Sequence, residues 1–333
     1  MCIRDRNNTS QYLDELMQGD LIDTKEIESR EEDMAEAIFK RLSQLPKDNM
    51  LDNKSMDKLL ENFTLSASSF NSYLTCPVRF YYENVLRVPG FSSEAAAYGT
   101  ALHDAMWRFF EKMMEDPKNE FGKVEDLIKF FKTEMFKSKG SFSESGYKFK
   151  LERGEKNIAE MYKQQVGSWP KNVKLEMNID SVDYDGVIMR GFLDRVDIIS
   201  PTVAEIVDYK TGSVRNMKMK VGGPTKTYPE GKQYWRQLIF YKILLENARD
   251  SKYKVLSAKI ASLEPNDNNH FDEYVVKISP EDEALVGELI KETWANIHAH
   301  KFEEGCGEEF CTWCNFANDH LSLVYEMDEV LEE

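Results

Sequence analysis

The feature that most constrains the fold is a predicted β-hairpin with its turn at Pro201. Polar and apolar residues alternate in strand-like fashion on both sides of this turn. With the turn centred there, Asp194 faces Asp208, and directly opposed residues have Cβ atoms about 4.5–5.5 Å apart. Lys210 lies two residues beyond Asp208 and therefore on the same face. The rest of that face is apolar, so two opposed carboxylates are costly there unless a cation offsets their charge.

Two aspartates with a nearby lysine suit a particular chemistry. Hard divalent cations such as Mg²⁺ or Mn²⁺ prefer oxygen ligands, keep several waters and commonly hold phosphates. Such a cation activates water and polarises a phosphoryl oxygen, while a lysine stabilises extra negative charge. Asp194, Asp208 and Lys210 therefore indicate metal-assisted hydrolysis of a phosphodiester. The alternative is a surface hairpin whose acids and lysine pair only with one another. A single β-bulge would favour this alternative, because it would shift the register and separate the two aspartates.

Three further blocks accompany the hairpin, in the order Phe63–Tyr82, Tyr98-Gly-Thr-Ala-Leu-His103, the hairpin itself, and Gln237-Leu-Ile-Phe-Tyr241. The first predicts a helix that Ser66 or Ser68 can cap. The last places its glutamine and tyrosine on one helical face. Together the blocks resemble the PD-(D/E)xK nuclease superfamily, in particular the RecB-like nuclease domain that is fused to UvrD/Rep-type helicases and found in AddB.

The resemblance implies an α/β fold of the restriction-endonuclease type, with a mixed central β-sheet flanked by helices and a helical N-terminal insertion. It implies a Mg²⁺- or Mn²⁺-dependent DNA nuclease, expected to act as an exonuclease on single-stranded DNA. The partner would be a helicase motor in the same chain or in another subunit, and the role DNA end processing, repair and recombination. Two alternatives stay open: a catalytically inactive nuclease fold that binds DNA as a scaffold, and a standalone exonuclease of the CRISPR-adaptation type.

The same resemblance assigns roles residue by residue. The predicted metal ligands are His103, Asp194, Asp208 and the Tyr209 carbonyl. The predicted catalytic residues are Asp194, Asp208, Lys210, Gln237 and Tyr241, the last two through hydrogen bonds to DNA or to the strand of the lysine. A histidine packed in the core is the plain alternative for His103. Glu176, at the head of a predicted strand, is interpreted as structural or as a group outside the direct ligands.

Charge is distributed unevenly along the chain. The net charge of −16 argues against a simple DNA-binding module, because phosphate binding usually leaves a basic footprint. Residues 209–242, however, contain eight basic residues and a single acid. We expect a mobile basic loop here, with Tyr228 and Trp235 available to stack on bases, although an ordinary solvated loop would look the same. The predicted DNA-binding residues are Arg79, Arg215, Lys218, Lys220 and Lys226.

Four of the five cysteines form a second candidate site: Cys76, Cys306, Cys311 and Cys314. In iron–sulfur relatives of the family, one upstream and three C-terminal cysteines bind a [4Fe–4S] cluster. The spacing here departs from the family's C-x2-C-x5-C, whose last position is occupied by His320. The sequence therefore leaves open a cluster with Cys306 as ligand, a cluster with His320, a zinc site made of Cys and His, or a lost cluster.

Residues 1–62 are predicted to precede a nuclease domain at 63–333. Residues 1–6 resemble a translated sequencing adapter, Ser10–Leu16 resembles the closing tail of UvrD-like helicase motors, and the charged stretch up to residue 62 predicts a helical connector. No Walker motif is present, so no ATPase is expected in this stretch. No apolar run predicts a membrane span, and the cysteine usage favours the cytoplasm.

Periodicity predicts the remaining elements. The expected helices are 121–138, 151–166 and 280–300, and the expected strands are 174–182, 187–199, 203–210, 255–263 and 273–278. These segments predict a sheet of four or five strands.

Overall fold

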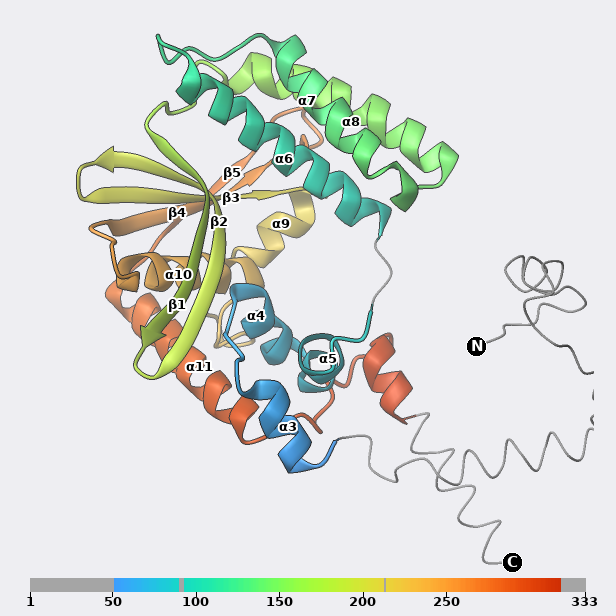
Figure 1. The fold of residues 1–333 in the computed structure, drawn as a ribbon, viewed down its shortest axis with the longest axis vertical. Coiled ribbons are helices and arrows are strands. Elements are labelled where there is room, and N and C mark those ends of the chain that lie inside the picture. Colours follow the sequence, from blue (N-terminus) through green and yellow to red (C-terminus); the bar gives the residue numbers. More distant parts are fainter. Residues whose placement is uncertain (1–50, 90–92, 213, 319–333) are drawn as a thin grey trace, which may run out of the picture. The chain divides into compact units, whose positions relative to one another are not determined.

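The predicted hairpin forms part of a five-stranded sheet. The computed structural model describes residues 51–89, 93–212 and 214–318. The strands are β1 (Val173–Tyr184), β2 (Val187–Ser200), β3 (Val203–Lys210), β4 (Lys254–Ser262) and β5 (Glu273–Lys277), in that spatial order (Figure 1). Neighbours are antiparallel except β3 and β4, which run parallel and are joined by a helical crossover. This confirms the predicted mixed sheet, and the predicted strand ends differ from the observed ones by two residues or fewer.

β2 and β3 pair in the register that the hairpin pattern predicts. Arg195 lies opposite Val207, and Val196 lies opposite Ile206. One step further along the ladder, the same register aligns Asp194 with Asp208. Val196 and Ile206 are fully buried, and a one-residue slip would move the side chains of one strand to the opposite face of the sheet, so the apolar pattern specifies the register.

Three helices cover one face of the sheet: α6 (Glu94–Glu115), α7 (Val124–Lys137) and α8 (Glu144–Gln165) (Figure 1). Their apolar side chains, such as Phe109 and Phe110, share one core with Val207 and Leu263 from the sheet side. α8 begins seven residues earlier than predicted, because Ser143 Oγ accepts a hydrogen bond from the Gly146 backbone and caps the helix there.

Helix α10 (Gln233–Asn247) packs against the other face and is buried on nearly all sides. α4 (Ala67–Thr75) and α11 (Pro280–His298) pack on it in turn, which explains why α10 is apolar around most of its circumference. Ser66 caps α4 through a capping box with Ser69, as predicted, and Ser279 caps α11 in the same way.

The segment that follows Lys210 differs from the expected loop. Residues Val214–Lys220 form a helix, α9, in which Met217 is buried. Residues 221–232 then form a loop whose two ends are joined by a hydrogen bond: the Lys232 N–H donates to the Gly222 carbonyl at 2.8 Å. The expectation of a loop is therefore wrong for Val214–Lys220. Burial of Met217 depends on tertiary packing, which the basic composition of this segment did not indicate.

The N-terminal part of the described chain packs on the same unit. In α3 (Asn53–Leu60), Met56 and Leu60 are buried, and the Leu51 N–H donates to Tyr81 Oη at 2.9 Å. Tyr81 begins a π-helix, Tyr81–Val85, that directly follows α5 (Pro77–Phe80). The adapter-like residues 1–6 and the helicase-like Ser10–Leu16 lie outside the described residues. Within the described ranges, no helix combines the length and apolar character that crossing a membrane requires.

A buried carboxylate joins α10 to β4. The Glu246 carboxylate contacts Lys242, lies 2.8 Å from Lys254 Nζ and accepts from the Val255 N–H at 2.7 Å, and its side chain is only 6% exposed. Burial alone raises the pKa of Glu246, but the hydrogen bonds from Lys242, Lys254 and Val255 outweigh burial and lower that pKa.

Replacement of Glu246 by glutamine is expected to reduce the free energy of unfolding by about 3 kcal/mol at neutral pH, since it leaves Lys242 buried with a weakened partner. A lowered folded-state pKa contributes stability that is present above the unfolded-state pKa and is lost as pH falls through the folded-state value. The difference between variant and wild type in urea denaturation should therefore shrink in acid. Glu288→Gln, which removes an exposed charge paired with Lys291, should change stability by less than about 0.5 kcal/mol. Equal effects of the two substitutions would contradict this assignment.

Candidate active site and cysteine cluster

The candidate active site lies at the end of β3, where residues from four elements meet. Asp194 comes from β2, Asp208 from β3, His103 from α6 and Gln237 from α10. His103 Nδ1 lies 3.4 Å from Asp194 Oδ2, and the Tyr209 backbone N–H donates to the same oxygen at 2.8 Å. The fold thus brings two of the predicted metal-binding side chains, those of His103 and Asp194, into contact.

Asp208 is held from two directions. Lys210 Nζ lies 2.6 Å from Asp208 Oδ2, and Gln237 Nε2 donates to Asp208 Oδ1 at 3.0 Å. The same amide group donates its second hydrogen to Tyr241 Oη, also at 3.0 Å. Of the two partners expected for Gln237, DNA or the strand of Lys210, the structure shows the strand. Tyr241 is only 9% exposed, and it is linked to Asp208 through the Gln237 amide.

The two aspartates differ in their electrostatics. Burial raises the pKa of Asp208; Lys210 lowers that pKa in part, and the charge of Asp194 raises it further. Burial also acts to raise the pKa of Asp194, but the hydrogen bond and charge of His103 outweigh burial and leave that pKa below its usual value. For His103, burial acts to lower the pKa, and the contact with Asp194 reverses this and raises it. Asp208 is buried, Asp194 is partly buried, and their pKa values shift in opposite directions. A cation at this position would stabilise the ionised forms of both carboxyl groups.

Glu176 on β1 is a third carboxyl group at this site. Its two neighbours in β1 lie opposite the two neighbours of Asp194 in β2, so Glu176 lies across from Asp194. Its backbone φ is +46°, which is uncommon for a residue other than glycine. Burial, and then the charge of Asp194, raise the pKa of Glu176 to about 7. The sequence interpretation left Glu176 outside the direct ligands, because only the pairing of β1 with β2 connects it to Asp194.

The donor set suits a hard divalent cation. Asp208 Oδ2 is buried, and its contact with Lys210 is not aligned as a hydrogen bond, so this oxygen lacks a well-directed donor. Carboxylate and carbonyl oxygens are the ligands that Mg²⁺ and Mn²⁺ prefer in proteins, and a neutral imidazole is a common metal ligand as well. Among the described residues, only the cysteines discussed below bring three or more ligand atoms within 4.8 Å of one another. Within the part of the chain that the structure describes, the acidic group therefore does not form a closed metal cage.

Gly99 explains how α6 brings His103 to the site. A Cβ atom at this position would lie 2.8 Å from Thr211 Oγ1, and Thr211 directly follows Lys210. α6 can approach the end of β3 this closely only because the residue has no side chain. His103 then lies four residues further on, about one helical turn, beside Asp194. The Gly-Thr-x-x-His block thus combines a close backbone contact at Gly99 with a predicted ligand, His103, about one helical turn later.

Lys220 is the predicted DNA-binding residue with a direct link to the site. Its Nζ lies 5.3 Å from the centre of the Tyr234 ring, and Lys210 Nζ lies 5.3 Å from the centre of the same ring. The sequence interpretation missed Tyr234. Its position three residues before Gln237, on the same side of α10, is the signal that would have identified it.

The other predicted DNA contacts are spread more widely. Arg215, Lys218 and Lys226 are exposed, whereas Arg79 lies beside the cysteines in an exposed ion pair, with its Nε 2.9 Å from Glu83. The expectation that Trp235 stacks on bases is wrong, because only 3% of its surface is exposed. The expected aromatic contact remains available at Tyr228, which is half exposed.

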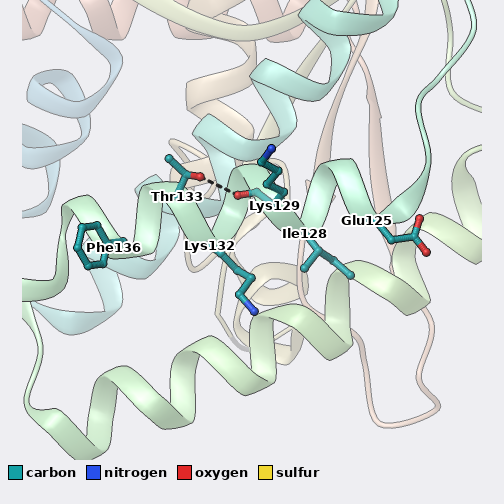
Figure 2. A pocket seen from close by; sticks show the side chains of 6 residues that line it. All are labelled: Glu125, Ile128, Lys129, Lys132, Thr133 and Phe136. Atoms are coloured by element: carbon teal, nitrogen blue, oxygen red, sulfur yellow. Dashed lines mark hydrogen bonds between the residues drawn. The ribbon is translucent and has the colours of Figure 1, made fainter.

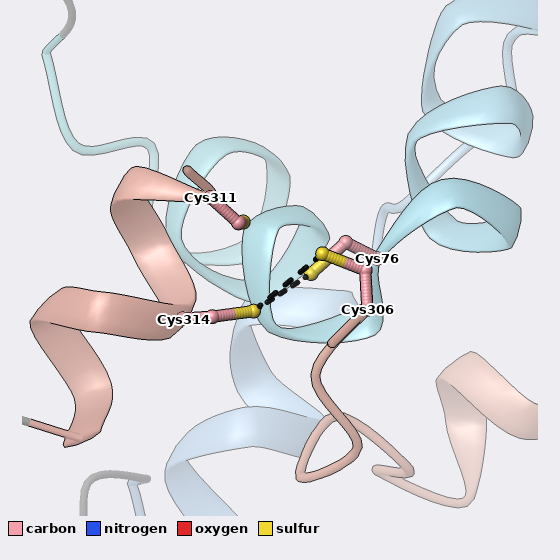
Figure 3. A group of neighbouring side chains, drawn as sticks. All are labelled: Cys76, Cys306, Cys311 and Cys314. Atoms are coloured by element: carbon pink, nitrogen blue, oxygen red, sulfur yellow. Dashed lines mark hydrogen bonds between the residues drawn. The ribbon is translucent and has the colours of Figure 1, made fainter. Parts of the chain in front are cut away.

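The four cysteines converge on one point. All four sulfur atoms lie within 4.8 Å of one another, and Figure 3 shows them directed toward a common centre. Cys76 Sγ lies 3.5 Å from Cys314 Sγ, which lies 3.8 Å from Cys306 Sγ. This arrangement agrees with Cys306 as the fourth ligand; the alternative, His320, lies outside the described residues. The group joins the start of α5 to residues 312–318, which are helical.

A separate surface hollow lies along α7. It is lined by Glu125, Ile128, Lys129, Lys132, Thr133 and Phe136 (Figure 2). None of these residues belongs to the acidic site or to the cysteine group. The candidate catalytic residues therefore lie at the end of β3 and not in this hollow.

Comparisons with known proteins agree with this geometry. Among solved structures, a protein of Eubacterium rectale described provisionally as an exonuclease superposes with a TM-score of 0.51 and 14% identity, over 82% of this chain and 93% of that one. The structure of SSO0001 gives a TM-score of 0.31 and 13% identity, over 77% and 85% of the two chains, which is too distant to support any conclusion. No curated protein matches. The first likeness supports the fold alone. A family model described as the PD-(D/E)XK nuclease superfamily matches residues 64–318, most of the sequence, and the chain therefore belongs to this superfamily.

Proposed function

We propose that this chain is a Mg²⁺- or Mn²⁺-dependent DNA nuclease of the RecB/AddB type. The observation that carries the proposal is the convergence of Asp194, Asp208 and Lys210 at the end of β3, with Gln237 hydrogen-bonded to Asp208. A surface hairpin with self-paired charges would not need the partly buried Gln237 amide from α10. An inactive scaffold would not need the complete set of two acids and a lysine.

Each side chain has a defined part in this proposal. His103, Asp194, Asp208 and the Tyr209 carbonyl would hold the cation, which when bound activates water and polarises the scissile phosphate. His103 keeps Asp194 ionised through their contact. Burial acts to lower the pKa of Lys210, but Asp208 raises it, so the lysine stays protonated and can stabilise the charge that grows on the phosphate oxygens.

We further propose that the substrate is mainly single-stranded DNA, degraded from its ends during repair and recombination. In this proposal a helicase motor, in the same protein or in a partner subunit, supplies the unwound strand. The support is the order of the four sequence blocks together with the helicase-like Ser10–Leu16. A standalone exonuclease would share the same site, and the coding sequence upstream of residue 7 would distinguish the two.

The purified full chain is expected to degrade end-labelled linear single-stranded DNA with Mg²⁺ or Mn²⁺, and not with EDTA. Circular single-stranded DNA should resist if the enzyme requires an end, whereas cleavage of the circle would indicate an endonuclease. DNA binding without cleavage in either metal, across the neutral pH range, would contradict the proposed catalysis and favour the scaffold.

Replacement of Lys218, Lys220 and Lys226 together by glutamine is expected to weaken single-stranded DNA binding and reduce its salt dependence. For every phosphate that the variant no longer neutralises, the slope of log K against log salt should fall by about 0.7. Binding measured in Ca²⁺ over a salt series would give this slope. The matched control neutralises Lys54, Lys58 and Lys129, which are exposed on α3 and α7 and carry the same charge. Equal slopes for the two triple variants would show that the segment after Lys210 is only solvated.

A further inference from the structure

The separations between the cysteine sulfurs carry information about the metal they can bind. Four thiolates around one tetrahedral Zn²⁺ have Zn–S bonds of about 2.3 Å, so their sulfurs lie about 3.8 Å apart. Here Cys314 Sγ lies 3.5 Å from Cys76 Sγ and 3.8 Å from Cys306 Sγ, and all four sulfurs lie within 4.8 Å of one another. These separations fit one central ion.

The [4Fe–4S] cluster that the family resemblance implies needs a wider arrangement. In such a cluster each of the four thiolates binds a different iron, and the irons alternate with inorganic sulfides at the corners of a cube. Each cysteine sulfur then lies outside its own corner, so the four are several ångströms further apart than ligands that share one ion. The observed quartet is too small to enclose a cube.

Contacts around the quartet hold the sulfurs where they are. Cys76 Sγ accepts from the Arg79 N–H at 3.4 Å, which ties this side chain to the N-terminus of α5. On the opposite side, a Cβ atom on Gly305 would lie 2.9 Å from Cys314 Sγ, so backbone closes that wall of the site. Expansion to cluster size would have to move these segments apart.

The helix that carries Cys314 and directly follows Cys311 is also anchored. The Trp313 ring stacks on Tyr82 with centroids 4.8 Å apart, and Trp313 Nε1 donates to Glu83 Oε1 at 2.9 Å. These contacts join residues 312–318 to the π-helix that follows α5. The spacing between the two sides of the cysteine site is therefore set by aromatic packing as well as by the cysteines themselves.

We infer that Cys76, Cys306, Cys311 and Cys314 bind a single tetrahedral Zn²⁺ and not a [4Fe–4S] cluster. The four thiols release their protons on binding, and the ion joins the two ends of the described unit as a closed, structural site. His320 is not needed, because four thiolates complete the tetrahedron. The inference is independent of the proposed nuclease activity, since it concerns different residues and a different metal.

The test is the metal content of the full chain, purified without oxygen from cells supplied with both iron and zinc. We expect colourless protein with one zinc per chain, without iron or acid-labile sulfide. Brown protein with about four irons and four sulfides per chain would overturn the inference. Protein with neither metal, which also fails to bind added Zn²⁺, would overturn it too.

Variants identify the ligands. Cys311→Ser should lose the zinc, whereas Cys2→Ser and His320→Ala should keep it; loss of zinc in His320→Ala would overturn the four-cysteine assignment. If Cys311→Ser does not fold, Co²⁺ added to metal-free wild type provides a second readout. Co²⁺ held by four thiolates gives intense sulfur-to-metal charge-transfer bands and strong tetrahedral ligand-field bands, and their absence would also contradict the inference. Asp208→Ala should leave the zinc content unchanged.

Discussion

Replacement of Lys210 or Asp208 by alanine is expected to lower the rate of DNA cleavage at least about 100-fold, as for loss of a main electrostatic group. Lys210 Nζ lies 2.6 Å from Asp208 Oδ2, and both residues lie at the end of β3 beside Asp194. In the proposed mechanism the lysine would supply the charge that stabilises the transition state, and the aspartate would supply a metal ligand. Single-turnover cleavage at saturating Mg²⁺ is the appropriate measurement, because it separates the chemical step from binding.

The matched control is Lys259→Ala. Lys259 is a mostly buried lysine on the neighbouring strand β4, and its Nζ lies 3.2 Å from both Glu205 and Glu273. This substitution also removes a strand lysine from ion pairs, so it reports the effect of strand disruption alone. Its cleavage rate should stay within a few-fold of wild type. Wild-type rates in both site variants, or equal losses in Lys259→Ala, would refute the assignment of the site.

Replacement of Cys76 by serine is expected to lower the Tm by roughly 10 °C or more. Cys76 is separated from Cys306 by more than two hundred residues, so a metal held between them closes a very long loop. On a chain-entropy model, closing a loop of this length stabilises the folded state by about 5 kcal/mol. The serine hydroxyl can still accept a hydrogen bond from the Arg79 N–H, so the cap at the start of α5 is kept. The change in Tm then reports the loss of the metal link alone.

Scanning calorimetry before and after treatment with a chelator provides the control. The Tm of wild type should fall on metal removal, and that of Cys76→Ser should not fall further, because its clip is already broken. Cys2→Ser should behave as wild type. A Tm for Cys76→Ser within about 2 °C of wild type would show that the four cysteines do not act as a stabilising clip.

The sequence determined the features that depend on local periodicity. The apolar alternation around Pro201 predicted the β2–β3 register, because a slip by one residue would put Val196 and Ile206 on opposite faces of the sheet. The same logic gave the strand ends to within two residues. Four cysteines of matching chemistry could be grouped from the sequence, yet the resemblance alone suggested a cluster, whereas sulfur separations in the fold point to a single ion.

Only the tertiary structure decided which polar groups meet. Glu176 joins the site because β1 pairs with β2, and Tyr234 lies near both Lys210 and Lys220 because α9 folds back toward α10. Trp235, one residue away, is buried instead. Periodicity in a sequence reports which face of an element is apolar, but not which other element covers that face. Contacts between residues distant in the chain, and the pKa shifts that follow from their burial, therefore arise only when the elements pack.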